Sequence, residues 1–367
     1  MATQYVTIKK SQPAFLDFLW GHIENNTKYP ANRDQRAIPV KTYNLGTPEE
    51  SITFELKALS EIKKPGFFVF VSALIKLNSF ILILFPLFYT LEKNYLSQGL
   101  LNPLSKLFAS LASVFLFAGL NIRNDVNDHI SGYDRVNIDL NNKPIRMGWL
   151  SASRASKISF VLILCSVVLA SLSTLLQPRL VWIIGLAGLL FLLAQFNKRN
   201  SYKQQHSGEL TLYLLIGPAL ATGYQVATGS AIDREILFFG LLWGFAVLYL
   251  IQINNFSHIM TSSQSGIKNT MTKLGFDWSQ KFLIAAWIFF IGIHTLFHLH
   301  YSQLRWTIIN FLVMVSVSAP TLLKIFNIKS PMGSGLQRIR KEAYRNFLVV
   351  VFLFLTEILW YQWTTSI

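Results

Sequence analysis

The chain has 367 residues, 52% of them apolar and 14% aromatic, and a formal net charge of +15. A mean hydropathy of +0.39 and long, recurring apolar stretches exclude an ordinary soluble globular protein. The basic residues lie between the apolar segments and form no single patch or arm, so the charge does not indicate a nucleic-acid-binding protein.

The N-terminal segment, residues 1–65, is mixed and polar, with prolines that include Pro30, Pro39 and Pro48. It predicts an extension on the cytoplasmic side of a membrane, with a short amphipathic helix around FLDFLWGHI. The remaining residues, 66–367, are predicted to form one membrane domain.

Nine apolar segments follow, each close to the ~20 residues that cross a bilayer as a helix. They cover about residues 66–91, 102–122, 157–177, 179–196, 208–228, 235–254, 281–299, 305–326 and 346–365. The sequence therefore predicts a helical protein that passes through a lipid bilayer nine times.

The cations between these segments predict the orientation. With the N-terminus in the cytoplasm, the outside loops hold few basic residues, whereas most others fall inside. The four on the outside are Lys93, Arg179, Arg234 and Arg305. We therefore expect a multi-pass protein, of a bacterial inner membrane, with a cytoplasmic N-terminus.

Acidic and amide side chains are concentrated at the cytoplasmic end of the second apolar segment, in NIRNDVNDHISGYDRVN, residues 121–137. Asn124 and Asp128 are four positions apart and Asp125 and Asp128 three, so on a helix they converge on one face. Clustered oxygen ligands suit Mg²⁺, which is commonly bound by carboxylates together with substrate phosphates.

Basic residues flank this segment, and Lys143 and Arg146 can contact phosphate oxygens. Arg123 is a further candidate for the same role. The pattern predicts a site for a lipid diphosphate bridged by Mg²⁺. The alternative is a solvated polar loop that ends a membrane span.

The segment NDVNDHISGYD resembles the first aspartate motif of the UbiA superfamily of intramembrane prenyltransferases, in the form found in 1,4-dihydroxy-2-naphthoate polyprenyltransferases. The matching residues are Asn124, Asp125, Asp128, Gly132 and Asp134. NKPIRMGWLS resembles the basic segment that follows in the family. SGELTLYLLIGPALATGY resembles its Gly-Glu segment through Glu209, Gly217 and Pro218. The resemblance covers about residues 66–365.

The resemblance implies an all-α membrane protein with nine transmembrane helices around a central cavity that opens toward the cytoplasm. It implies Mg²⁺-assisted transfer of a prenyl group from a polyprenyl diphosphate to an aromatic acceptor. Asn124, Asp125 and Asp128 would bind Mg²⁺, with Asp134 as a further catalytic residue. Basic side chains would neutralise the leaving diphosphate, and aromatic rings would stabilise the allylic cation.

The second aspartate motif of the family is altered in this chain. Asn254 and Asn255 keep its frame, but His258 and Ser262 stand where the family has its two aspartates. Neither side chain is a good ligand for Mg²⁺. Two interpretations stay open: His258 binds diphosphate as a cation or hydrogen-bond donor, helped by Lys268, or the polar loop has lost its site.

The acceptor and the outcome of the reaction are less constrained. Tyr202 and Glu209 are candidates for contact with the acceptor, although Tyr202 also suits a membrane interface. Two alternatives to an aromatic prenyltransferase remain. One is an intramembrane terpene cyclase of the same superfamily, and the other is a homologue that binds prenyl lipids without catalysis.

Overall fold

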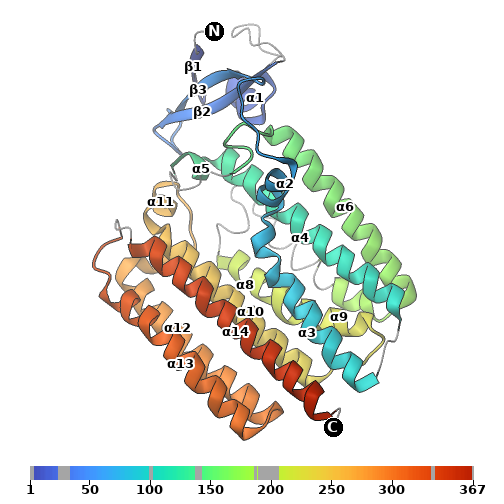
Figure 1. Cartoon of the computed structure of the whole chain (residues 1–367). Coiled ribbons are helices and arrows are strands. Elements are labelled where there is room, and N and C mark those ends of the chain that lie inside the picture. Colours follow the sequence, from blue (N-terminus) through green and yellow to red (C-terminus); the bar gives the residue numbers. More distant parts are fainter. Residues whose placement is uncertain are drawn as a thin grey trace. The chain divides into compact units, whose positions relative to one another are not determined.

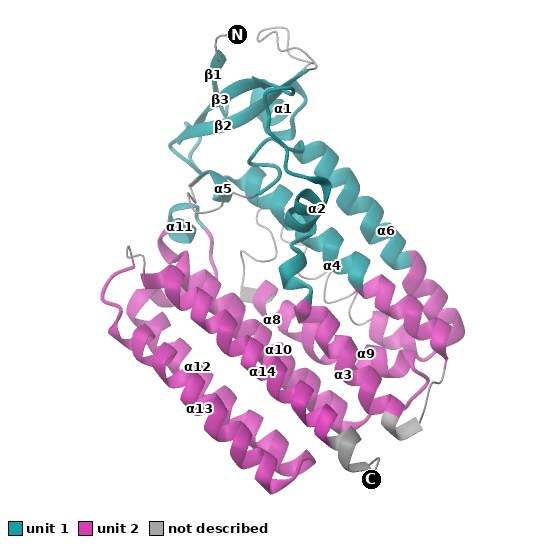
Figure 2. Cartoon of the chain, viewed as in Figure 1, with its two compact units in different colours: residues 1–80, 114–167, 261–266 teal, residues 81–113, 168–260, 267–367 magenta. Residues whose placement is uncertain are grey.

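The computed structural model of the chain describes residues 4–23, 34–98, 102–136, 143–185, 188, 206–331 and 335–365. Figure 2 shows two compact units. Unit 1 contains residues 1–80, 114–167 and 261–266, and unit 2 contains residues 81–113, 168–260 and 267–367.

The N-terminal residues of unit 1 form a three-stranded antiparallel sheet with one helix on it (Figure 1). The strands β1 (Gln4–Lys9), β2 (Gln35–Tyr43) and β3 (Ser51–Ala58) pair in the order β1-β3-β2. The helix α1 spans Ala14–Trp20, within the segment that the sequence predicts to be a short amphipathic helix.

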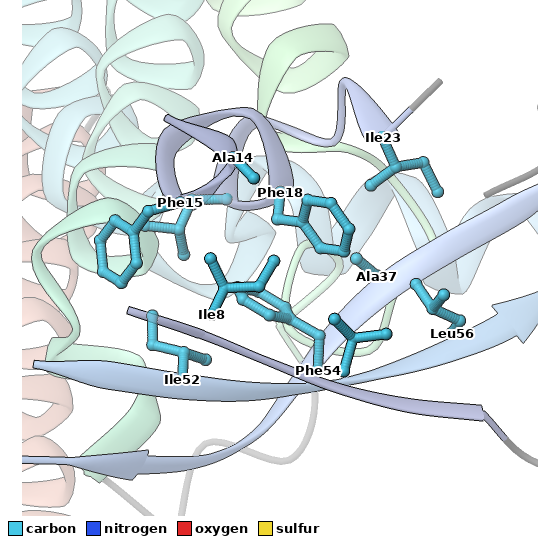
Figure 3. Packing of buried hydrophobic residues seen from close by; sticks show 11 residues of the cluster. Ile8, Ala14, Phe15, Phe18, Ile23, Ala37, Ile52, Phe54 and Leu56 are labelled. Atoms are coloured by element: carbon cyan, nitrogen blue, oxygen red, sulfur yellow. The ribbon is translucent and has the colours of Figure 1, made fainter. Parts of the chain in front are cut away.

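The core of this small sheet follows from the period-two pattern of its strands. In β3 the alternate residues Ile52, Phe54 and Leu56 are buried on one face. Phe15 and Phe18 of α1 cover that face, and the ring centroids of Phe18 and Phe54 lie 5.4 Å apart (Figure 3). The sheet was not predicted, because the segment was interpreted as mixed and polar. The all-α prediction therefore holds for the membrane-spanning part of the chain alone.

The rest of the described chain is helical. The helices of its first part are α2 (Phe67–Ile75), the 3₁₀ turn η2 (Leu77–Ser79), α3 (Ile81–Gln98), α4 (Pro103–Ser131), α5 (Tyr133–Val136) and α6 (Ala152–Leu176). Those of its second part are α8 (His206–Leu214), the π-helical turn η4 (Leu215–Ala219), α9 (Leu220–Ala227), α10 (Arg234–Ser257), α11 (Ile259–Gln264), α12 (Thr270–Tyr301), α13 (Leu304–Asn327) and α14 (Gly335–Thr365).

Among the described residues, seven helical segments are long and apolar enough to cross a membrane. An eighth results if α2 and the helix after it, bent by 48°, count as one broken span. Most of the predicted span 179–196 lies outside the described residues. The multi-span helical fold is thus confirmed, and the count of nine stays a prediction.

Small residues allow close helix contacts within each unit. In unit 1, Ser159 Oγ donates to the carbonyl of Gly119 at 2.8 Å, where a Cβ on Gly119 would lie 2.8 Å from Ile163. In unit 2, a Cβ on Gly217 would lie 2.5 Å from the carbonyl oxygen of Gly240, and one on Gly244 would lie 2.6 Å from that of Tyr213. These glycines let α10 and the segment α8–η4 pack backbone against backbone.

Candidate functional site

The first aspartate motif lies on the last two turns of α4. Asn124, Asp125 and Asp128 are all buried, and Asp125 is only 2% exposed. Asn124 Nδ2 donates to Asp128 Oδ2 at 3.0 Å. The two side chains therefore share a face, as the spacing of four residues predicts.

The helix ends at Gly132, which has a φ of +90°, in the left-handed region that glycine tolerates best. The chain turns there into α5, whose second residue is Asp134. The carboxylate of Asp134 is 1% exposed. The turn thus adds a third buried carboxylate to the pair on α4.

Lys143 joins the three carboxylates. Its Nζ lies 3.1 Å from Asp125 Oδ1, 2.9 Å from Asp128 Oδ2 and 2.7 Å from Asp134 Oδ1. A second ammonium, that of Lys76, lies 2.7 Å from Asp125 Oδ1. Buried charges persist only when they are paired in this way, so the three aspartates and two lysines form one electrostatic unit.

The protonation of the groups outside the spans follows from these contacts. Burial raises the pKa of Asp134 to about 6, and the charge on Lys143 opposes the rise. Burial alone would lower the pKa of Lys143, but the charges of Asp128, Asp134 and Asp125 raise it well above its usual value. Lys143 is therefore a cation at neutral pH.

The oxygen atoms of this cluster decide whether it fits Mg²⁺. Among the described residues, no group of three His, Cys, Asp or Glu side chains is arranged as a ready metal site, and Lys143 contacts all three carboxylates. Three buried oxygens nevertheless have no hydrogen-bond partner: Asn124 Oδ1, Asp125 Oδ2 and Asp134 Oδ2. Carboxylate and amide oxygens are the ligands that a hard divalent cation prefers, so the donor set fits Mg²⁺.

One residue of the altered second motif contacts α5, the short helix that carries Asp134. Ser262 on α11 is buried and hydrogen-bonded to the side chain of Tyr133 on α5. Burial, followed by the charge of Asp128, raises the pKa of Tyr133 to about 12, so its phenol is neutral. Unit 1 therefore brings together Ser262 and the first motif.

The other residues of the second motif lie in unit 2. Arg340 Nη1 lies 2.9 Å from His258 Nε2, and because a guanidinium can only donate, His258 Nε2 is the acceptor. At this position Arg340 therefore carries the positive charge. The predicted action of His258 on diphosphate stays a prediction.

Glu209 is held by the frame of the second motif in unit 2. Its Oε1 accepts from Asn255 Nδ2 at 3.0 Å and from the backbone N–H of Thr270 at 3.3 Å. The hydroxyl of Thr270 donates to Glu209 Oε2. Glu209 thus links α8 to α10 and to the start of α12, and its role toward an acceptor stays a prediction.

The remaining predicted residues differ in their burial. Arg123 Nη1 donates to Ser156 Oγ on α6 at 2.8 Å, Arg146 is half-buried, and Asn254 and Lys268 are exposed. Tyr202 lies outside the described residues.

Sequence reasoning assigned no site role to Lys76, Tyr133 or Arg340. A lysine inside an apolar span was a signal for Lys76, because such residues pair with a buried partner. Tyr133 was adjacent to a motif residue. For Arg340 there was no signal, because 82 residues separate it from His258.

Comparison with known proteins identifies the family. The model of the UbiA prenyltransferase family matches residues 71–332, more than two thirds of the chain. No curated protein matches the sequence.

Solved structures share the fold at low sequence identity. A UbiA homologue from Archaeoglobus fulgidus bound to GPP and Mg²⁺ is 13% identical, with a TM-score of 0.55, over 79% of this chain and 99% of its own. A digeranylgeranylglyceryl phosphate synthase is 16% identical, with a TM-score of 0.56, over 79% of this chain and 98% of its own. The archaeal homologue bound to DMAPP and Mg²⁺ is 14% identical, with a TM-score of 0.53, over 78% and 98% of the two chains. With the family model covering most of its helices, this chain belongs to the UbiA prenyltransferase family.

Proposed function

We propose that the protein transfers a prenyl group from a polyprenyl diphosphate to an aromatic acceptor within the membrane, with Mg²⁺ as cofactor. The observation that carries the proposal is the buried set of three aspartates joined by Lys143 at a helix end. Carboxylates can bind a diphosphate through a bridging Mg²⁺, and a lysine can contact its oxygens directly. The archaeal homologue with this fold binds GPP or DMAPP together with Mg²⁺, which supports the same substrate class here.

In this proposal, Asn124, Asp125 and Asp128 would hold Mg²⁺ through oxygens such as Asn124 Oδ1 and Asp125 Oδ2, with Asp134 as a further catalytic residue. When bound, Mg²⁺ supplies positive charge to the diphosphate oxygens as the C–O bond breaks. Lys143 keeps the carboxylates ionised and close together, because its ammonium touches three of them.

The bond change is a heterolysis. The electron pair of the C–O bond leaves with the diphosphate, and the allylic carbon becomes cationic. Lys143 and Arg146, the cations of the segment after the motif, stabilise the charge that develops on the leaving group. An electron-rich ring carbon of the acceptor then forms the new C–C bond, and the ring loses a proton to a base.

We further propose the cytoplasmic orientation of the N-terminus and of the first motif, since the positive-inside bias supports both. The division into an extension of residues 1–65 and a membrane domain of residues 66–367 is part of the same proposal.

Product analysis tests the proposed function. Purified protein is incubated with prenyl diphosphates of several lengths, with and without Mg²⁺, and with phenol, quinolone and naphthoate acceptors, followed by mass spectrometry. We expect prenylated acceptor and free diphosphate in the presence of Mg²⁺ only. A cyclic hydrocarbon without acceptor would identify a cyclase, and binding without diphosphate release would identify a non-catalytic homologue. Either result would contradict the proposal.

A further inference from the structure

The N-terminal sheet contacts the first aspartate motif within unit 1. Glu50, directly before β3, is 3% exposed, and its Oε1 lies 3.1 Å from Arg135 Nη2 on α5. Arg135 is the residue directly after Asp134, and its side chain is 4% exposed. A buried ion pair thus joins the sheet to the short helix that carries a motif carboxylate.

The second oxygen of Glu50 is bound within the N-terminal segment itself. Oε2 accepts from Lys10 Nζ at 3.0 Å and from the backbone N–H of Gly46 at 3.2 Å. The carboxylate of Glu50 is therefore held by residues of the N-terminal segment as well as by Arg135. A fixed carboxylate can define the position of its partner, because Arg135 must reach it to neutralise its own buried charge.

The motif's glycine makes room for this contact. A Cβ on Gly132 would lie 2.5 Å from Leu45 Cδ1 and 2.5 Å from Arg135 Nη2. The left-handed turn at Gly132 is therefore covered by the loop before β3 as well as by Arg135.

Two more contacts fix the same helix end. The side chain of His129 is hydrogen-bonded to the backbone of Leu19 on α1, and Ile130 packs on the core under the sheet. The segment that carries Lys143 is also covered, because a Cβ on Gly148 would lie 2.8 Å from Ile38 on β2. The N-terminal residues thus contact both the end of α4 and the segment that carries Lys143.

We propose that the N-terminal sheet positions the first aspartate motif through the Glu50–Arg135 ion pair, which makes Glu50 a positioning residue for Asp134 and Lys143. The sheet lies before the region that the family model matches. The consequence of this positioning for catalysis rests on the proposed function, whereas the positioning itself is a property of the ligand-free chain.

Hydrogen–deuterium exchange of the full chain in detergent micelles tests the positioning. In Glu50→Gln and Arg135→Gln, peptides covering residues 129–136 should exchange about tenfold faster, while β3 keeps its protection. The double variant should exchange no faster than either single one, because both act through one contact. Lys10→Gln is the matched control: Lys10 also contacts Glu50, but it is 43% exposed and does not reach α5.

A second readout separates this inference from the proposed function. If both hold, Glu50→Gln weakens Mg²⁺-dependent GPP binding about tenfold, as expected when a supporting contact of a metal site is lost. Absence of GPP binding by the wild-type chain would contradict the proposed function, while the exchange data would still decide the positioning. Unchanged exchange at 129–136, an equal effect in Lys10→Gln, additive single variants, or equal loss of protection in β3 would overturn the inference. Should Glu50→Gln not fold, Arg135→Gln, which removes the same ion pair from the other side, gives the same comparison.

Discussion

Lys143 is the residue on which the charge balance of the site depends. Its ammonium contacts Asp125, Asp128 and Asp134, and its side chain is 13% exposed. Removing one partner from a buried charged cluster leaves the others uncompensated, which typically costs about 3–5 kcal/mol of unfolding free energy.

We therefore predict that Lys143→Gln lowers the unfolding free energy in detergent by about 3 kcal/mol. Mg²⁺ should restore part of the loss, because it supplies positive charge to the same carboxylates, and should stabilise the variant more than the wild type. Chemical unfolding with and without Mg²⁺ measures both effects. Lys157→Gln, at an exposed position of α6, is the control and should change neither value. An equal Mg²⁺ effect in wild type and Lys143→Gln would contradict this account of the cluster.

Contacts between site residues could be predicted only where the residues are close together in the sequence. Asn124 and Asp128 share one helix, so a spacing of four placed them together. The partners of those residues are set by tertiary structure: Lys143 reaches Asp125 from 18 residues away, and Arg340 reaches His258 from 82 residues away. The charge pattern predicted Lys143 to be a phosphate ligand, and this stays a prediction; its contact with the carboxylates could not be predicted without the fold.

At the scale of elements, the helix containing the motif continues beyond its apolar part. The predicted span ended at residue 122, whereas α4 runs to Ser131. The last turns are polar yet buried, because unit 1 surrounds them with the N-terminal sheet and Lys143. Hydropathy alone could not predict this extension. It also missed the sheet, although SITFELK in β3 shows the period-two alternation of a half-buried strand.

Close packing of glycines in unit 2 leads to a prediction for α10. Gly244→Ala places a methyl group 2.6 Å from the backbone oxygen of Tyr213. This oxygen belongs to a helix backbone, so it cannot easily move away from the methyl group. We expect a loss of about 1–3 kcal/mol of unfolding free energy. Gly292→Ala on α12 is the matched control, because a Cβ there has no atom within 4 Å and alanine favours a helix by up to about 1 kcal/mol. Thermal unfolding in detergent should rank Gly244→Ala below wild type and Gly292→Ala at or above it. The reverse order would contradict the packing described for α10.

At the scale of the whole molecule, the distribution of cations supports the orientation that we propose in the membrane. In that orientation Lys268 lies on the cytoplasmic side and Gln303 outside, with α12 crossing between them. In a Cys165→Ser background, Lys268→Cys should react with a membrane-impermeant thiol reagent only in inverted vesicles. Gln303→Cys should react in intact cells. Both positions are exposed, so burial does not prevent labelling. Labelling of both from the same side would refute α12 as a span.

The helical membrane fold and the family could be predicted from the sequence, because apolar periodicity and one motif sufficed for both. The number of spans could not be settled, since seven or eight are found among the described residues. The two altered positions of the second motif, His258 and Ser262, also have different surroundings. Ser262 lies with the first motif in unit 1 and His258 with Arg340 in unit 2, a division that spacing along the chain does not reveal.

The central claim is that the aspartates of α4 and α5 bind a prenyl diphosphate with Mg²⁺ and promote its cleavage. The most direct measurement is an Mg²⁺ titration of diphosphate release from GPP by wild type, Asp128→Ala and Asp277→Ala. Asp277→Ala controls for loss of an exposed aspartate on another helix. We predict Mg²⁺-dependent release by wild type and Asp277→Ala, and a loss of at least about a hundredfold in folded Asp128→Ala. Release by Asp128→Ala at the wild-type rate, with the same Mg²⁺ requirement, would contradict the account.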